Sequence, residues 1–419
     1  EIYATGDTRL DDTLISRLDP AIPLLSQLLQ NNIEEFNNSI IKIIKEKFTA
    51  VQPAVEWKFN EVAWRYLHEN RTSPGHHEIE EISFENVHPL YGAIDIRNST
   101  IERNSAMQKD LRLQFSLLIG LLEDLKLKSG FGLLDEKIFL TRKWQAGLGG
   151  QQGIEQENEL NEFLEYDINP FLLQFVEGNP EYSQDVNEYF DAINEETGQV
   201  YESRRQMEAS MSLVISAVNK YLDQVKTESQ QAYPCYFEKF RTDGVEYDIY
   251  IGQSIAPDKP FNEIYLKNLR LLQLTSMAAI ARNTHQLQRQ LTRPVETTQL
   301  IFIHSHPIDI RFRKDEKRFD VEGAYNIRYH IVKKRIDKVQ VKGTGERLTQ
   351  PGRIALVYFN QKEADEYISY IKYLQGEKVL KEDLEYLELE ELQGVSGLKA
   401  MRVGVNLVEA QQDVAKPVN

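Results

Sequence analysis

The spacing of apolar residues changes near residue 230, and this change limits the possible folds more than any other feature of the sequence. Before it, apolar side chains recur every three or four residues, as in residues 24–48, which is typical of a helix that buries one face. After it, residues 235–240 and 245–251 alternate on either side of Asp243-Gly244, which predicts a β-hairpin with a two-residue turn. The chain is therefore expected to combine helices with a sheet.

Residues 1–229 are predicted to form an acidic helical bundle. Glycines and glutamines predict a flexible joint near residues 145–155, and Tyr91–Ser99 is interpreted as a shaped turn at a helix entrance. The expected helices cover residues 24–48, 57–67, 98–128, 155–166, 169–177 and 183–228.

Residues 230–419 are predicted to form an α+β domain with a mostly antiparallel or mixed sheet. After the hairpin we expect helices at about 261–290, 321–338 and 361–375, and strands at 299–304, 354–359 and 399–407. The overall fold class is therefore α+β, with an all-α bundle followed by a sheet domain.

Charge is divided unequally between these halves. Residues 1–229 hold 21 Lys and Arg against 39 Asp and Glu, a net charge of −18, whereas residues 230–419 carry +2. Binding to the phosphates of nucleic acid requires an excess of Lys and Arg, so this acidity argues against contact between the first half and nucleic acid. The single cysteine, Cys235, is predicted to be a core residue. Since one cysteine cannot form an intrachain disulfide, the sequence favours a reducing cytoplasmic compartment. No apolar run is long enough for a membrane span, and the start at Glu1 suggests a fragment or processed product.

The sharpest local motif is His304-Ser305-His306-Pro307, which follows an apolar strand. Two imidazoles at positions i and i+2 of an extended segment point the same way, as a zinc pair requires. The motif resembles the His-Ser-His-Pro signature of zinc-dependent deubiquitinase-like metalloproteases. That resemblance implies a metal-dependent hydrolase using His304 and His306.

The remaining positions of that signature depart from the pattern. The serine and the metal-binding aspartate of the metalloproteases are replaced by Lys314 and Lys317. A lysine cannot act as an anionic zinc ligand, so a third ligand would have to come from Asp309, Asp315 or Asp320. A strand end with one packed and one solvated histidine is therefore the favoured interpretation, and no cofactor is expected.

A basic cluster follows the motif: residues 309–353 hold 13 Lys and Arg against 7 Asp and Glu. Arg guanidinium groups match phosphate and carboxylate oxygens, so the cluster could bind an anionic small ligand or an acidic protein surface. A solvated face and docking against the acidic half stay open as alternatives. The residues expected to contact the ligand are Arg328, Lys334, Arg335, Arg311 and Arg313, flanked by Tyr325 and Tyr329.

The glycine-containing segment Lys342–Arg347 lacks the strand-before, helix-after context of a phosphate-binding loop. A helix-to-strand connection with glycine at positive φ explains it more simply.

Several stretches resemble a family of bacterial proteins described as GAF-domain-containing, in the long region outside their GAF module. The resemblance rests on Pro89–Ser99, Tyr236–Gly252, Phe319–Lys338 and Leu392–Leu398. It implies intracellular signalling as a context, offers no catalytic residues, and suggests that the sheet of residues 233–407 is a divergent sensor-type sheet.

The sequence thus predicts a non-enzymatic signalling or scaffolding fragment whose α+β domain recognises an anionic ligand or partner through a basic face. A metal-dependent hydrolase and a purely structural region, with function residing before Glu1, are the alternatives. Apolar helical stripes also predict a homodimer formed through helices.

Overall fold

The computed structural model describes residues 20–48, 51–72, 78–148, 157–193, 198–322, 329, 332–333, 336, 339–391, 395 and 397–408. The protein is α+β overall, with a mainly helical N-terminal region and a mixed sheet towards the C-terminus, which confirms the predicted fold class. None of the described helices is long and apolar enough to cross a membrane.

Within the described residues, nine strands form one sheet. The order is β2-β3-β1-β4-β7-β9-β8; β4 and β7 are parallel, the other pairs are antiparallel, and β5 pairs with β1 and β6. The strands are β1 (Ser83–Ile96), β2 (Tyr236–Arg241), β3 (Val245–Ile251), β4 (Thr297–Phe302), β5 (Ile308–Arg313), β6 (Arg318–Glu322), β7 (Arg353–Tyr358), β8 (Glu385–Glu388) and β9 (Lys399–Gly404).

The central strand comes from the half expected to be helical. Residues 91–96, interpreted above as part of a turn, belong to β1 and lie between β3 and β4. Both faces of this strand are buried, so its side chains do not alternate between apolar and polar and give no period-two signal. The expected boundary at 229–230 therefore does not separate a helical unit from the sheet.

Most described helices match the predicted ones, but α5 (Leu133–Gly147) was not predicted and one predicted helix is divided. The expected helix 183–228 is interrupted: α8 ends at Asp191 and α9 begins at Glu202. The α-helices are α2 (Ala21–Lys47), α3 (Pro53–Thr72), α4 (Ser99–Ser129), α5 (Leu133–Gly147), α6 (Glu157–Glu162), α7 (Asn169–Gly178), α8 (Ser183–Asp191), α9 (Glu202–Ala232), α10 (Glu263–Leu287) and α12 (Gln361–Gly376), with a π-helical turn η2 (Phe163–Ile168) and 3₁₀ turns η3 (Pro180–Tyr182) and η4 (Gln288–Gln290).

The start of α9 is fixed by a residue of another helix. Asp110 on α4, almost fully buried, accepts hydrogen bonds from the backbone amides of Ser203 (2.7 Å) and Arg204 (2.9 Å). It thereby satisfies two amides that the first turn of a helix leaves free.

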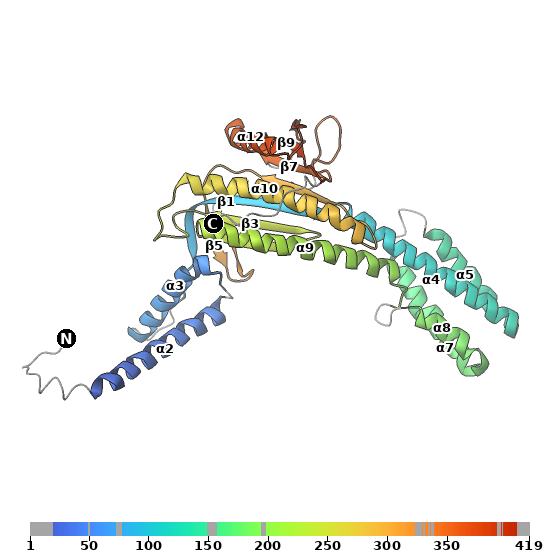
Figure 1. Cartoon of the computed structure of the whole chain (residues 1–419). Helices are drawn as coiled ribbons and strands as arrows, with labels where there is room; N and C mark the ends of the chain where they lie inside the picture. The colour runs from blue at the N-terminus through green and yellow to red at the C-terminus, as the bar shows by residue number, and fades with distance from the viewer. Residues whose placement is uncertain are drawn as a thin grey trace, which may run out of the picture.

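Among the described residues, buried apolar side chains form three hydrophobic cores between the elements drawn in Figure 1. The first lies between one face of the sheet and helices α9, α10 and α12. The second lies on the opposite face, under β5, β6, α3 and the C-terminal end of α2. The third holds together an arm of α4, α5, α7 and α8 that extends beyond the sheet.

Two predicted segments fall partly outside the described residues. These are the joint near 145–155, whose residues 145–147 belong to α5 and whose residues 149–155 are not described, and the helix 321–338. Its first two positions belong to β6, and only 329, 332–333 and 336 of the rest are described.

Candidate functional site

The structure brings few of the predicted ligand-binding residues together. Arg328, Lys334, Arg335 and Tyr325 lie outside the described residues. Arg311, in the middle of β5, forms ion pairs with Glu81 (2.6 Å) and with Glu322. Arg313 is exposed at the end of the same strand.

Tyr329 does not lie on an exposed helical face, as the sequence analysis expected. Its side chain is fully buried, its ring stacks on Phe302 at 5.4 Å between centroids, and its edge meets His304 at 5.2 Å. Because Phe302 points from β4 into the second core, Tyr329 is a core residue at the sheet surface and its ring is unavailable as a flanking contact.

The histidine motif forms a strand end with internal hydrogen bonds. His304 Nδ1 lies 2.9 Å from the carbonyl oxygen of His306, and the two rings are edge-on at 6.1 Å. Burial lowers the pKa of His304. The carboxylate of Glu363 accepts hydrogen bonds from the backbone amide and the hydroxyl of Ser305. Glu363 also forms a capping box with Asn360 at the start of α12. Among the described residues, no group of three or more His, Cys, Asp or Glu is placed to hold a metal ion.

A charged cleft, which sequence analysis did not identify, lies on the second-core face of β2 and β3. We call it the β2–β3 cleft; it has a volume of about 610 Å³. Its lining residues are Lys239, Phe240, Arg241, Thr242, Glu246, Asp248, Arg318, Phe319, Asp320 and Lys333.

The strand register places Glu246 and Asp248 in the lining of this cleft and Glu238 beside them. Glu238 on β2 lies directly opposite Asp248 on β3, and Asp248 lies opposite Tyr91 on β1. Directly opposed residues point to the same face of a sheet. Glu246, two positions before Asp248, shares that face.

Two cations from outside these strands face the acidic row. Lys333 forms an ion pair with Asp248, and its ammonium lies 5.3 Å from the Tyr91 ring centre and 5.1 Å from that of Phe240. The guanidinium of Arg318, the first residue of β6, lies 5.2 Å from the Phe240 ring centre. Aromatic faces stabilise cations electrostatically, so the rings help to hold both groups in the cleft.

Burial perturbs the titration of this row. The pKa of Asp248 is raised by burial, against the opposing effect of Lys333 and Arg318. The pKa of Glu238 is also raised by burial, although the Tyr236 hydroxyl donates to it at 2.5 Å. Burial and the Asp248 carboxylate raise the pKa of Tyr329.

Several polar atoms of the cleft keep hydrogen-bonding capacity. Asp248 Oδ1, the Tyr329 hydroxyl and Arg318 Nε form no hydrogen bond of standard geometry with the part of the chain that is described. Asp248 and Tyr329 are at least 98% buried. The Tyr329 hydroxyl lies outside the cleft lining and interacts with the Asp248 carboxylate, and the Arg318 guanidinium pairs with Glu316. Buried polar atoms are nearly always paired in native proteins, so Arg318 Nε is the cleft atom that indicates room for a polar ligand.

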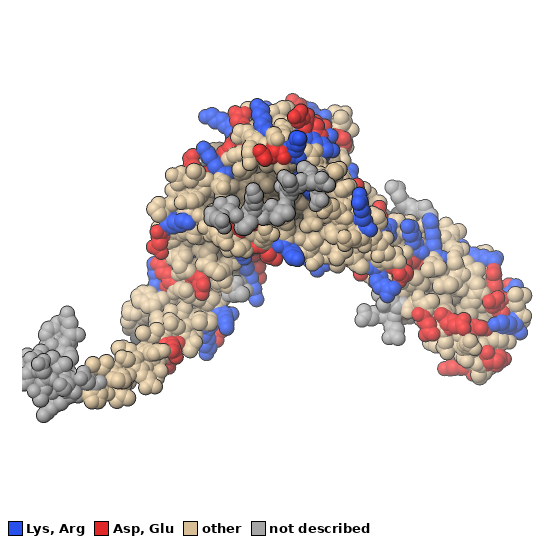
Figure 2. Space-filling model, in the orientation of Figure 1, with Lys and Arg blue, Asp and Glu red and all other residues tan. Residues whose placement is uncertain are grey.

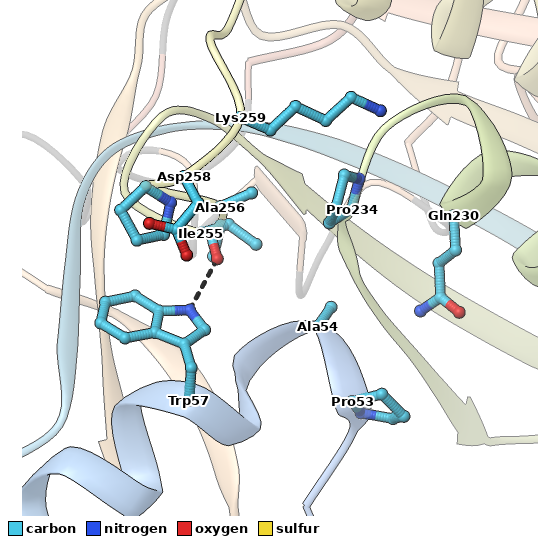
Figure 3. A pocket seen from close by; sticks show the side chains of 10 residues that line it. Pro53, Ala54, Trp57, Gln230, Pro234, Ile255, Ala256, Asp258 and Lys259 are labelled. Carbon is cyan, nitrogen blue, oxygen red and sulfur yellow. Dashed lines mark hydrogen bonds between the residues drawn. The ribbon is translucent and has the colours of Figure 1, made fainter.

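A second cavity, of about 400 Å³, lies where α3 meets the loop after β3 (Figure 3). Trp57 crosses it and donates its indole N–H to the Ile255 carbonyl oxygen at 2.9 Å. Prolines 53, 234 and 257 and Ala54 supply apolar walls. The hydrogen bond and these apolar walls identify the cavity as the place where α3 docks on the body of the protein.

Comparisons with known proteins give no family for this chain. No protein-family model and no curated protein matches it. Among solved structures, the crystal structure of the guanylyl cyclase Cya2 is similar over 47% of this chain and 82% of its own length, at 15% sequence identity and a TM-score of 0.28. A likeness this weak carries no argument about function.

Proposed function

We propose that the protein is a non-enzymatic recognition module of cytoplasmic signalling, and that the β2–β3 cleft binds a small polar ligand carrying an anionic group. The observation that carries the proposal is the convergence of Asp248, Lys333 and Arg318 in a cavity of about 610 Å³, where Arg318 Nε has no hydrogen-bond partner among the described residues. Small-molecule sites typically have volumes of about 300–1,000 Å³ and few convergent polar groups.

The cleft supports a ligand with two kinds of group. Arg318 and Lys333 offer charge-assisted donors to a carboxylate or phosphate. Asp248 Oδ1 offers an acceptor to a hydroxyl or amine on the same ligand. The ring of Phe240, which contacts both cations, adds an apolar wall.

This proposal keeps the anionic ligand expected from the sequence and moves its site from a basic helix to the sheet face. The resemblance to GAF-domain-containing proteins supports the signalling context. The cleft lies on the second-core face of the sheet, and the long helices α9 and α10 pack on the opposite face (Figure 1). A ligand in the cleft would therefore be separated from α9 and α10 by the strands of the sheet alone.

A thermal-shift measurement tests the site. The full chain is melted with glutamate, citrate, ADP or inorganic phosphate, each of which presents an anionic group. At least one probe should raise the melting temperature, because a ligand that binds only the native state stabilises it. Arg318→Gln should lower the affinity for that ligand about 10-fold or more, which is the usual effect of losing one charge-assisted hydrogen bond.

Two further variants locate the binding surface. Arg112→Gln, an exposed arginine on α4, should leave the shift unchanged. Arg313→Gln should also leave it unchanged, since Arg313 belongs to the basic cluster expected from the sequence and not to the cleft lining. If no probe shifts the melting temperature, or if the shift survives Arg318→Gln and disappears with Arg313→Gln, the β2–β3 cleft is not the recognition site.

A further inference from the structure

The N-terminal part of α2 exposes the largest group of apolar side chains on any described helix. Its C-terminal end is packed: Ile43, Ile44 and Phe48 belong to the second core. The outer part points away from the body of the protein (Figure 1). Six residues there are each more than half exposed: Ile22 (55%), Leu24 (68%), Leu25 (57%), Leu28 (58%), Leu29 (60%) and Ile33 (59%). We call them the α2 patch.

Soluble proteins seldom leave such a contiguous patch in water unless it binds something. The sequence analysis expected the apolar stripe of residues 24–48 to pack against another element. Among the described residues, only the C-terminal end of α2, nearest α3, packs against another element. The outer patch is therefore an interaction surface whose partner is not part of the described chain.

We propose that the α2 patch binds the α2 patch of a second copy of this chain, giving a homodimer through paired α2 helices. Ile22, Leu25, Leu29 and Ile33 follow steps of three and four residues, the spacing with which one helix packs along another. A two-fold contact between identical surfaces needs a self-complementary patch, and a leucine and isoleucine stripe meets that condition.

Charge favours an identical helix over other partners. Residues 20–33 contain no charged side chain, so two copies meet without repulsion, and the outer end of α2 forms an uncharged surface in Figure 2. A helix that lies on a membrane typically carries Lys and Arg on its polar face, whereas the polar residues here are Ser, Gln and Asn. The patch also lacks the charges that an acidic or basic protein partner would recognise.

The area of the patch sets the expected strength. At about 100 Å² of apolar surface per fully exposed Leu or Ile, the six residues offer roughly 350 Å² per copy. Two copies would bury roughly 700 Å² plus their polar flanks, which is below the lower limit of about 1,200 Å² for stable interfaces and corresponds to a weak, transient dimer. The net charge of −16 on each chain opposes association, so the dimer is expected at moderate salt with a micromolar Kd.

Sedimentation velocity of the full chain tests the proposal. Over about 1 to 100 μM protein, the mass should rise from 48.7 kDa towards twice that value. The double variant Leu25→Lys with Leu29→Lys should remain at 48.7 kDa, with a Kd at least about 100-fold weaker. Both positions are exposed, so its circular dichroism and melting temperature should match those of the wild type.

A matched control separates the patch from a general effect of added charge. Leu127→Lys with Leu173→Lys changes two exposed leucines outside α2 (84% and 57% exposed) and should dimerise like the wild type. A wild-type chain that stays monomeric throughout the range, including one that binds phosphatidylcholine vesicles instead, would overturn the proposal. So would a dimer that persists in the Leu25→Lys, Leu29→Lys variant.

Discussion

At the scale of single residues, the β2–β3 cleft depends on which side chain faces which. Glu238 and Asp248 are directly opposed; Asp248 is buried and Glu238 is partly buried, and burial raises the pKa of each. Only Asp248 has a lysine partner, Lys333. A buried carboxylate that lacks a fully compensating positive partner destabilises the native state at pH values above its ordinary pKa. A site that retains two such carboxylates is therefore a candidate binding site.

Glu238→Gln should therefore stabilise the protein at neutral pH. Because the native pKa of Glu238 lies above its ordinary value of 4.5, its favourable contribution is present below that value and is lost as pH rises through the native pKa. A neutral glutamine still accepts from the Tyr236 hydroxyl and avoids this loss. The melting temperature should rise by about 1–3 °C at pH 7.5, and the difference should disappear near pH 4.

The control is Glu388→Gln, at an exposed position of β8. Melting curves of both variants and the wild type across this pH range give the comparison. If the Glu238→Gln variant is less stable than the wild type at pH 7.5, the Glu238 carboxylate stabilises the native state, which contradicts the burial argument.

At the scale of elements, the tight turn between β2 and β3 fixes the register that builds the cleft. Arg241 pairs with Val245, so the loop has three residues, 242–244, rather than the two expected from Asp243-Gly244. With a two-residue turn, Glu238 would face Ile249 instead of Asp248. Gly244 fits this loop because a Cβ atom there would lie 2.0 Å from the Ile94 carbonyl oxygen of β1.

Gly244→Ala should destabilise the protein by at least about 2 kcal/mol, since the obstructing atoms are backbone of the central strand and cannot move aside cheaply. Gly120→Ala is the matched substitution. Gly120 is exposed on α4 with nothing within 4 Å of the added methyl group, so alanine should stabilise the helix by about 0.5–1 kcal/mol. Urea unfolding midpoints measure both changes. Equal midpoints for the two variants would exclude the close approach of this turn to β1.

Most helices, although not α5, could be predicted because their signal is local, whereas much of the sheet could not. The alternation in Ile308–Arg313, with Ile310 and Phe312 buried and Arg313 outside, is a strand signal that its basic composition obscured. β1 has two buried faces and therefore no alternation. The positive φ expected for glycine in Lys342–Arg347 is confirmed, since Gly343 and Gly345 have φ of 90° and 66°; the helix expected before it lies mostly outside the described residues.

The candidate site was beyond the reach of the sequence for a similar reason. Its lining residues come from β2, β3, β6 and the position of Lys333, and Lys239 and Lys333 are 94 residues apart in the sequence. A one-residue error in the hairpin register also separates Glu238 from Asp248. The buried character of Cys235, by contrast, followed from its place beside a strand, and burial raises the pKa of its thiol to about 11.

At the scale of the whole molecule, the chain is a central sheet with two helical extensions. The arm of α4, α5, α7 and α8 has its own core, and α2 with α3 extends from the other end of the sheet. If α2 pairs with a second copy, two clefts are held in one assembly, each separated from the α2 patch by the second core. Ligand binding and dimerisation are then expected to be separable by mutation: Arg318→Gln should leave the mass unchanged, and Leu25→Lys with Leu29→Lys should leave the ligand bound.

The most direct test of the β2–β3 cleft is the electron density of crystals grown with the probe that raises the melting temperature most. The account predicts density for that probe against Phe240, with its anionic group at Arg318 Nε and a donor at Asp248 Oδ1. Density for the probe in the cavity beside Trp57, or against Arg313 outside the cleft, would contradict it.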